Sequence, residues 1–403
     1  MVQFELQIMV AIHHRGTERT EDARRLECHS GLRATSVYSV PLWCIAHLIV
    51  LSTLALGASV VGARAQEQAA SAAQPGARAE GVTPSPPLGT VAWQMRTHGS
   101  VYATPLVSAG VVYVGSYDYS VYAADATSGR ELWRVKTGGR VISAPVAAGD
   151  ALYFGSQDNK LYALTAASGQ VRWKFKTQYA VSASPVVAGE LVVVASTDGF
   201  VYAVETATGK ERWRASAKRG TPTAPVAAGP RLYVGSAAGL QALDAADGHE
   251  LWSVKTDGAV VAAPVVVAGT LYCTTLRGSL YALDAERGGE RWRAQVEGGL
   301  PFSPAAAGGA VYCGGIGGTL YAFDAGSGRE LWRYVSEQGV TSAPTPAGAL
   351  VHFGTAKGLV ALDAQTGAPR WTFPTNAIVT SAPAVAAGLV YFGGWDGTLY
   401  AVR

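Results

Sequence analysis

The chain has 403 residues, of which 48 are glycine and only 15 % are charged, and its formal net charge is +3. This length allows two average domains or one large repetitive domain. The small net charge, without lysine and arginine clusters that alternate with aromatic residues, argues against nucleic acid as a partner. Few charges with many glycines, alanines and valines indicate short buried strands joined by tight turns.

The first 65 residues differ from the rest of the chain. Residues 1–39 contain five arginines and five acidic residues, whereas Val40–Gly62 is almost wholly apolar and is followed by the small-x-small sequence at 63–65. This order predicts a leader with a secretory signal that is cleaved after Ala65. An uncleaved membrane anchor is the alternative, because the apolar run is long enough to span a bilayer.

The next segment, 66–89, is rich in alanine, proline and glutamine and has no periodicity. Such a composition predicts a disordered linker. We therefore expect three parts: the leader 1–65, the linker 66–89 and a repetitive domain 90–403. Cleavage would place that domain in the periplasm or outside the cell, and only an uncleaved N-terminal segment would contact a membrane.

From residue 90 onward, three residue types recur every 39 or 40 positions. The markers are Trp93, 133, 173, 213, 252, 292, 332 and 371; Pro105, 145, 185, 225, 264, 304, 344 and 383; and Ala123, 163, 203, 242, 282, 322, 361 and 401. Three markers with one period predict a repeat architecture.

Each unit contains four short strand candidates separated by turn sequences. In one unit these are Gly139–Pro145, Ala151–Ser156, Leu161–Ala166 and Val171–Thr177. Four strands per unit are typical of a β-propeller blade, so eight units predict an all-β, eight-bladed propeller of four-stranded antiparallel blades. The stretch 90–97 precedes the first complete unit, and we expect it to supply the outer strand of the eighth blade and close the ring.

The recurrent residues suit these positions. A proline on the innermost strand loses no ladder hydrogen bond at a free edge. The alanine keeps stacked sheets close, and the glycine of the Ser-Gly or Thr-Gly turn adopts positive φ. The tryptophan on the outer strand fills the gap between splayed blades. The aspartates before the turn, namely Asp125, Asp244, Asp284, Asp324 and Asp363, are expected to accept turn hydrogen bonds.

The units resemble the PQQ-like propeller repeat. One unit matches at Ser143, Pro145, Tyr153, Gly155, Ser156, Asp158, Tyr162, Ala163, Gly169 and Trp173, and the resemblance covers nearly all of 90–403. It implies the propeller fold but not one function, because the same repeat occurs in quinoprotein dehydrogenases, in the outer-membrane assembly scaffold BamB and in extracellular sensor domains.

The resemblance implies specific groups for a quinoprotein dehydrogenase: an adjacent Cys-Cys disulfide, acidic and Asn ligands for Ca²⁺, and a catalytic Asp. This chain has no adjacent cysteines, and its units never exceed 40 residues. His98, His249 and His352 occupy different repeat positions, so we do not expect them to converge on a metal. We expect no catalytic residue, cofactor or metal; PQQ and Ca²⁺ belong only to the oxidoreductase alternative.

Cys273 and Cys313 occupy equivalent positions in neighbouring units. Equivalent Cα atoms of adjacent blades should lie about 8–11 Å apart, beyond the ~7 Å limit for a disulfide. We therefore predict two small buried residues rather than a bridge.

The loops that enter the first strand and those between the second and third strands should share one face. Entering loops carry His98, Arg140, Lys218 and Arg219 in one half of the ring and Asp257, Glu297 and Glu337 in the other. They predict a two-sided charge pattern, with ordinary solvated loops as the alternative.

Three aromatic residues stand out on the loops between second and third strands. Trp395 in the eighth unit and Tyr117 and Tyr119 in the first should become neighbours when the ring closes. Exposed tryptophan and tyrosine are favoured binding anchors; local loop packing is the alternative.

The sequence favours a monomeric, extracytoplasmic, non-catalytic scaffold similar to BamB that binds a protein or peptide of the cell envelope. A quinoprotein-like oxidoreductase and a sensor ectodomain are the alternatives.

Overall fold

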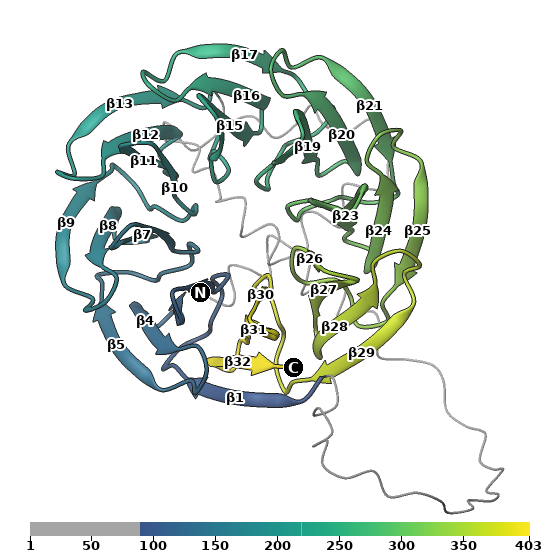
Figure 1. Cartoon of the computed structure of the whole chain (residues 1–403). Helices are drawn as coiled ribbons and strands as arrows, with labels where there is room; N and C mark the ends of the chain where they lie inside the picture. Colours follow the sequence, from purple (N-terminus) through teal and green to yellow (C-terminus); the bar gives the residue numbers. More distant parts are fainter. Residues whose placement is uncertain (1–88, 219) are drawn as a thin grey trace, which may run out of the picture. The chain divides into compact units, whose positions relative to one another are not determined.

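The computed structural model describes residues 89–218 and 220–403, which form eight four-stranded antiparallel sheets arranged in a ring (Figure 1). The predicted eight-bladed propeller is confirmed. Blade 1 consists of β2 to β5, the numbering continues around the ring, and blade 8 consists of β30, β31, β32 and β1. Within the described residues, no helix has the length and hydropathy needed to cross a membrane. The predicted leader 1–65 and linker residues 66–88 lie outside the described residues.

The innermost strand of each blade has three residues and starts directly after the recurrent proline. The predicted first strand Gly139–Pro145 was therefore wrong. Proline cannot donate to a ladder, and the preceding segment is held by a side chain instead: Ser143 Oγ lies 2.9 Å from both the N and the O of Gly155. The innermost strands are β2 (Leu106–Ser108), β6 (Val146–Ala148), β10 (Val186–Ala188), β14 (Val226–Ala228), β18 (Val265–Val267), β22 (Ala305–Ala307), β26 (Thr345–Ala347) and β30 (Ala384–Ala386).

The second strands are buried almost throughout, because a blade packs on each of their faces. They are β3 (Val111–Gly115), β7 (Ala151–Ser156), β11 (Leu191–Ala195), β15 (Arg231–Ser236), β19 (Thr270–Thr274), β23 (Ala310–Gly314), β27 (Leu350–Thr355) and β31 (Leu389–Gly393). Cys273 and Cys313 are free and buried here, as predicted. Burial raises the pKa of Cys273 to about 12.

The third strands carry the recurrent alanine, which is fully buried in every blade. Ala163, for example, pairs with Tyr153 on one side and Trp173 on the other. These strands are β4 (Ser120–Asp125), β8 (Lys160–Thr165), β12 (Phe200–Glu205), β16 (Gly239–Asp244), β20 (Ser279–Asp284), β24 (Thr319–Asp324), β28 (Gly358–Asp363) and β32 (Thr398–Val402).

The outer strands carry the tryptophans, which seal one blade to the next as predicted. Trp133 Nε1 donates to the carbonyl of Ala166 in the following blade (3.0 Å), and Tyr113 Oη donates to the same carbonyl (3.3 Å). Gly169 faces Trp133 with φ 71°, and a Cβ there would lie 2.8 Å from the indole ring. The outer strands are β5 (Glu131–Lys136), β9 (Val171–Lys176), β13 (Glu211–Ser216), β17 (Glu250–Val254), β21 (Glu290–Gln295), β25 (Glu330–Val335), β29 (Pro369–Pro374) and β1 (Val91–Arg96).

The ring closes through β1, which pairs with the last strand, β32 (Figure 1). Trp93 of β1 seals blade 8 to blade 1 as Trp133 seals blade 1 to blade 2: its Nε1 donates to the Ala126 carbonyl (2.9 Å), which also accepts from Tyr391 Oη (3.1 Å). The predicted closure by the N-terminal strand is confirmed. It joins the two ends of the domain, so no sheet edge is left open by an incomplete blade.

The turns between third and outer strands use the recurrent aspartate. Asp324 Oδ1 accepts from Ser327 N (2.8 Å) and Ser327 Oγ (2.6 Å), and Asp125 makes the equivalent pair with Ser128. These bonds lower the pKa of both aspartates below the ordinary value. The expected turn role of these residues is confirmed.

Candidate binding site

The two predicted sets of loops do meet on one face, which we call the loop face. Backbone hydrogen bonds join the two loops of a blade, as in blades 1, 2 and 8: Tyr117 N donates to Ser100 O (3.0 Å), Gln157 N to Arg140 O (2.9 Å) and Trp395 N to Ile378 O (3.1 Å). The loops of this face therefore have defined positions relative to one another.

Three rings and one guanidinium group form a row on the loop face, which we call the aromatic ladder: Trp395, Tyr102, Tyr117 and Arg140. Tyr102 lies between the other two rings, with its centroid 6.2 Å from Trp395 and 5.5 Å from Tyr117, stacked on the latter at an interplanar angle of 20°. The Arg140 guanidinium lies 4.8 Å from the centroid of Tyr117. The ladder thus connects blades 8, 1 and 2.

The sequence analysis predicted that Trp395 and Tyr117 would come together but missed Tyr102, which joins them. Tyr102 is three positions before the recurrent proline, where the other units have Ile142, Ser182 and other non-aromatic residues. The departure from the repeat was therefore visible in the sequence. Its proximity to Trp395 depends on ring closure, which brings positions about 290 residues apart into contact.

The Trp395 ring is held in place by its surroundings. Its Nε1 donates to Thr380 Oγ1 (2.9 Å), and its carbonyl accepts from Ser100 Oγ of blade 1 (2.8 Å). The rings of the ladder are half-buried, so each keeps part of its surface accessible. Rings that are already fixed lose little conformational entropy when a partner binds.

Tyr119 lies two residues beyond the ladder, and none of the described ring contacts involves it. Its backbone is left-handed, with φ 71°, at a position where the neighbouring blades have Asn159 and Gly199, also with positive φ. The carbonyl of Tyr119 accepts from Thr137 N (2.7 Å), while its side chain is 43 % exposed. It is the most accessible of the three predicted aromatic anchors.

The charged candidates are not drawn together by the fold. Lys218 Nζ points to the outer strand β17, where it lies 2.7 Å from Glu250 and 3.1 Å from Ser253 Oγ. The Asp257 carboxylate accepts from Ser279 Oγ (2.5 Å), within its own blade. Exposed positions on entering loops are occupied by His98, Arg140, Glu297 and Glu337. Arg219 lies outside the described residues.

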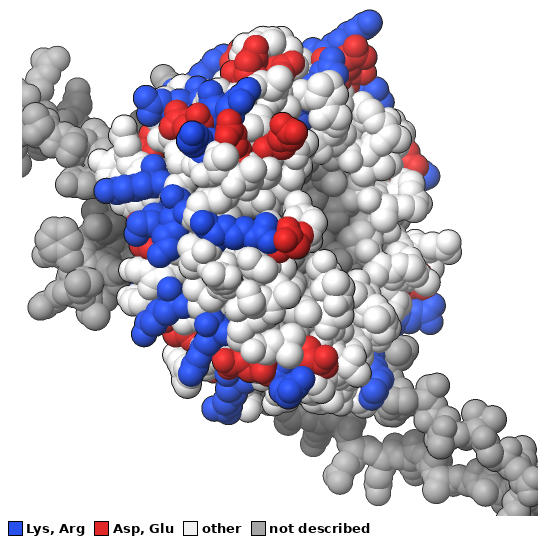
Figure 2. Space-filling model, turned by 60° about the vertical axis from the view of Figure 1, so that its left-hand side comes forward, with Lys and Arg blue, Asp and Glu red and all other residues white. Residues whose placement is uncertain are grey.

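The charge separation on the entering loops is offset by the neighbouring loops. Asp118, Asp158 and Asp198 stand on second-to-third-strand loops in the half with basic entering loops, whereas Arg277 and Lys357 stand in the other half. Figure 2, which turns one side of the ring forward, likewise shows basic side chains interspersed with acidic ones. The aromatic ladder is therefore a more distinctive feature of the loop face than its charge.

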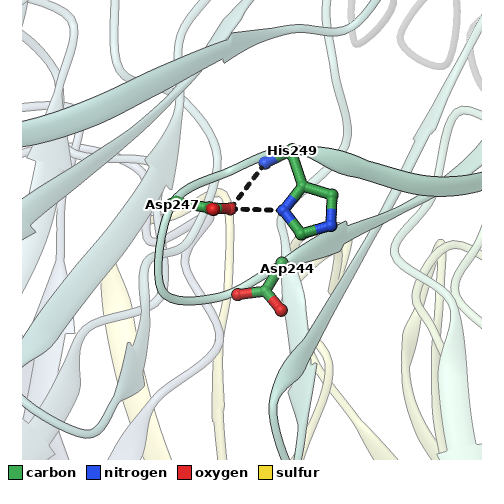
Figure 3. Close-up of side chains that lie close together, drawn as sticks. All are labelled: Asp244, Asp247 and His249. Atoms are coloured by element: carbon green, nitrogen blue, oxygen red, sulfur yellow. Dashed lines mark hydrogen bonds and ion pairs between the residues drawn. The ribbon is translucent and has the colours of Figure 1, made fainter.

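One group of three potential metal ligands occurs in the described part of the chain. Asp244, Asp247 and His249 lie on one hairpin turn with ligand atoms within 4.8 Å of one another (Figure 3). Asp247 Oδ1 accepts from His249 N (3.0 Å) and contacts His249 Nδ1 (2.6 Å), and Asp244 Oδ1 accepts from Ala246 N (2.7 Å). These bonds are those of an ordinary turn. The other two histidines of the described residues lie elsewhere: His98 on the loop face, and His352 in the core beside Trp371.

The described residues do not fit the quinone and Ca²⁺ that the resemblance implies for an oxidoreductase. Cys273 and Cys313 are buried on β19 and β23 of different blades, so they cannot form a disulfide between adjacent residues over a cofactor. The turn of Asp244 lies at the end of the third strand, on the face opposite to the loop face.

The comparisons with known proteins agree with this architecture. A family model described as outer membrane protein assembly factor BamB, of PQQ-like repeats, matches residues 52–180, 118–239, 163–263, 197–299 and 351–403, more than half of the chain. The chain belongs to this family. Among curated proteins, no sequence matches the chain significantly.

Solved structures with the same fold are diverse in function. BamB from Moraxella catarrhalis has a TM-score of 0.70 and 20 % identity, covering 78 % of this chain and 99 % of its own. The computationally designed Ika8 protein has a TM-score of 0.69 and 18 % identity, and the match covers 76 % of this chain and 97 % of the designed chain. The quinohemoprotein alcohol dehydrogenase ADHIIG from Pseudomonas putida HK5 has a TM-score of 0.68 and 17 % identity, and the match covers 78 % of this chain and 76 % of the dehydrogenase. At these identities the likeness shows the fold alone.

Proposed function

We propose that this BamB-family chain is a non-catalytic propeller scaffold that binds a protein or peptide partner through the aromatic ladder. The proposal rests on one observation: three half-buried rings from blades 8 and 1 form a row, with centroids 6.2 and 5.5 Å apart, and the Arg140 guanidinium lies over the last ring. Tryptophan, tyrosine and arginine are the residues enriched at binding hot spots. The family description, an assembly factor, supports a protein that acts by contact with other proteins.

We propose further that the protein works outside the cytoplasm, in the periplasm or secreted, as a monomer. The apolar segment Val40–Gly62 before a small-x-small site supports export. Mass spectrometry of the mature protein should find Gln66 at the N-terminus. A mature chain that keeps Val40–Gly62 would contradict cleavage and favour a membrane-anchored sensor ectodomain.

The partner can be sought by site-specific photo-cross-linking in the intact cell envelope. A benzophenone amino acid replaces Tyr119, which is 43 % exposed next to the ladder, and in a control it replaces Leu331, which is 41 % exposed on the outer strand β25. We expect a discrete protein adduct from position 119 that disappears when Trp395→Ala and Tyr102→Ala are added. Equal adducts from both positions, or an adduct that the ladder substitutions leave unchanged, would refute the proposal.

We propose that binding requires no cofactor. Adding pyrroloquinoline quinone and Ca²⁺ to the purified protein should give neither the cofactor's absorbance in the protein fraction nor dye reduction with alcohols or sugars. Stoichiometric retention of the quinone together with dye reduction would support the oxidoreductase alternative instead.

A further inference from the structure

A tyrosine of the third strand fills the space between neighbouring blades near the loop face. It occurs in six blades, as Tyr122, Tyr162, Tyr202, Tyr281, Tyr321 and Tyr400. In four of them its hydroxyl donates to an aspartate of the adjacent loop, as in Tyr162 to Asp158 (2.5 Å) and Tyr202 to Asp198 (2.9 Å). The preceding blade supplies a wall: the Phe175 ring lies 5.6 Å from that of Tyr202.

Blades 4 and 7 lack this tyrosine. Blade 4 has Gln241 in its place and blade 7 has Val360. The loop between the second and third strands is one residue shorter in both blades, which accounts for the two tryptophan spacings of 39 residues. The shorter loops close as two-residue hairpins, with Thr355 paired to Gly358 in blade 7, and they contain no aspartate. The ring and its hydrogen-bond acceptor are thus missing together.

Pockets occur at these two places. The one in blade 4 has a volume of about 340 Å³ and the one in blade 7 about 390 Å³. In blade 4 polar side chains line the pocket and pair with one another: Gln241 donates to Glu250 (2.7 Å), and Lys218 forms an ion pair with the same carboxylate. Lys218 and Glu337, two of the charged candidates from the sequence, therefore line different pockets rather than one surface.

The blade 7 pocket has the walls of a ring-binding site. Tyr334 of the preceding blade and Val360 line it, and Val360 is 7 % exposed. In place of a loop aspartate it has Lys357, which is exposed at the opening. An ammonium group donates hydrogen bonds and favours an oxygen that accepts them or carries negative charge.

We infer that the blade 7 pocket binds a p-hydroxyphenyl group, whose ring takes the place of the missing tyrosine and whose oxygen accepts from Lys357. The six other blades supply the template, because the same chain places a phenol ring in the equivalent space. The group can belong to a small phenol or to a tyrosine side chain of a bound protein. This inference concerns a different part of the loop face from the aromatic ladder and does not depend on it.

The test uses the full chain and two probes, p-cresol and a short peptide with one central tyrosine. Ligand-observed NMR and calorimetry measure binding to the wild type and to Val360→Tyr, in which the pocket is refilled, with Gln241→Tyr as the matched control in blade 4. We expect p-cresol to bind the wild type and Gln241→Tyr alike, and Val360→Tyr to bind at least about tenfold more weakly, because a filled cavity leaves no room for the ring.

A second variant guards against misfolding of Val360→Tyr. Tyr202→Val opens the equivalent space in blade 3, so p-cresol should raise its melting temperature by more than that of the wild type. Binding of both probes to the wild type would assign a protein side chain as the occupant, and binding of p-cresol alone a small phenol. The inference is overturned if neither probe binds at millimolar concentration, or if Val360→Tyr binds p-cresol as well as the wild type does.

Discussion

The substitution Trp93→Ala tests whether β1 is an integral part of the ring. Trp93 is 7 % exposed, and its removal takes away both the packing between blades 8 and 1 and the bond from Nε1 to the Ala126 carbonyl. Replacing a buried tryptophan with alanine costs about 3–5 kcal/mol. Because Tyr391 Oη still donates to that carbonyl, no buried acceptor is left unsatisfied, and we expect a loss of about 3–4 kcal/mol.

The free energy of unfolding is measured by urea denaturation followed by circular dichroism, with Trp133→Ala as the matched control. Trp133 makes the same contacts between blades 1 and 2 but is only half-buried, so its replacement should cost about 1 kcal/mol less. If Trp93→Ala cost less than about 1 kcal/mol while Trp133→Ala remained destabilising, β1 would not be holding the ring closed, and the account of closure would be refuted.

Three further predictions concern stability and reactivity. Gly169→Ala should destabilise strongly, because a Cβ would lie 2.8 Å from an indole ring, whereas Gly149→Ala, also at positive φ but with nothing within 4 Å, should cost only about 1 kcal/mol; equal losses in thermal melts would contradict the packing argument. Hydrogen bonds from Arg370 and Thr366 lower the pKa of Asp363 from 3.8 to about 2. The ionised Asp363 therefore stabilises the fold above pH 3.8, and this stabilisation is lost as the pH falls towards 2. The difference in free energy of unfolding between the wild type and Asp363→Asn should shrink across that range, and a difference that stays constant would contradict the role of these hydrogen bonds. Cys273, whose pKa burial raises to about 12, should resist alkylation until the protein unfolds, and rapid labelling of the native protein would show that this core is open.

The sequence predicted the ring because its markers are tied to packing. Each of the alanines and tryptophans occupies a place that recurs in every blade, and the contacts of Trp133 with Ala166 and Gly169 are repeated around the propeller. Periodic spacing therefore translates directly into blade number and closure. The same reasoning predicted that Trp395 and Tyr117 would be neighbours, since it needed only the order of blades around the ring.

What the sequence did not predict depends on side-chain direction and on hydrogen bonds outside the repeat. Lys218 was grouped with the loop face, but its ammonium reaches Glu250 on an outer strand. The innermost strand was placed before Pro145, but backbone pairing begins after it, because only the residues beyond the proline face a partner strand. The blade 7 pocket arises because the loop is one residue shorter and Val360 replaces the recurrent tyrosine. In the sequence the shorter loop is visible only as a repeat spacing of 39 residues instead of 40.

The most direct test of the account is the affinity of the cross-linked partner, once purified, for ladder variants of the full chain. We predict that Trp395→Ala with Tyr102→Ala weakens binding at least about tenfold with little change in melting temperature, as expected for hot-spot side chains. Leu331→Ala, at a 41 % exposed position on the outer strand β25, serves as the control and should bind as the wild type does. Wild-type affinity in the ladder variant would show that the partner binds elsewhere and would contradict the proposed function.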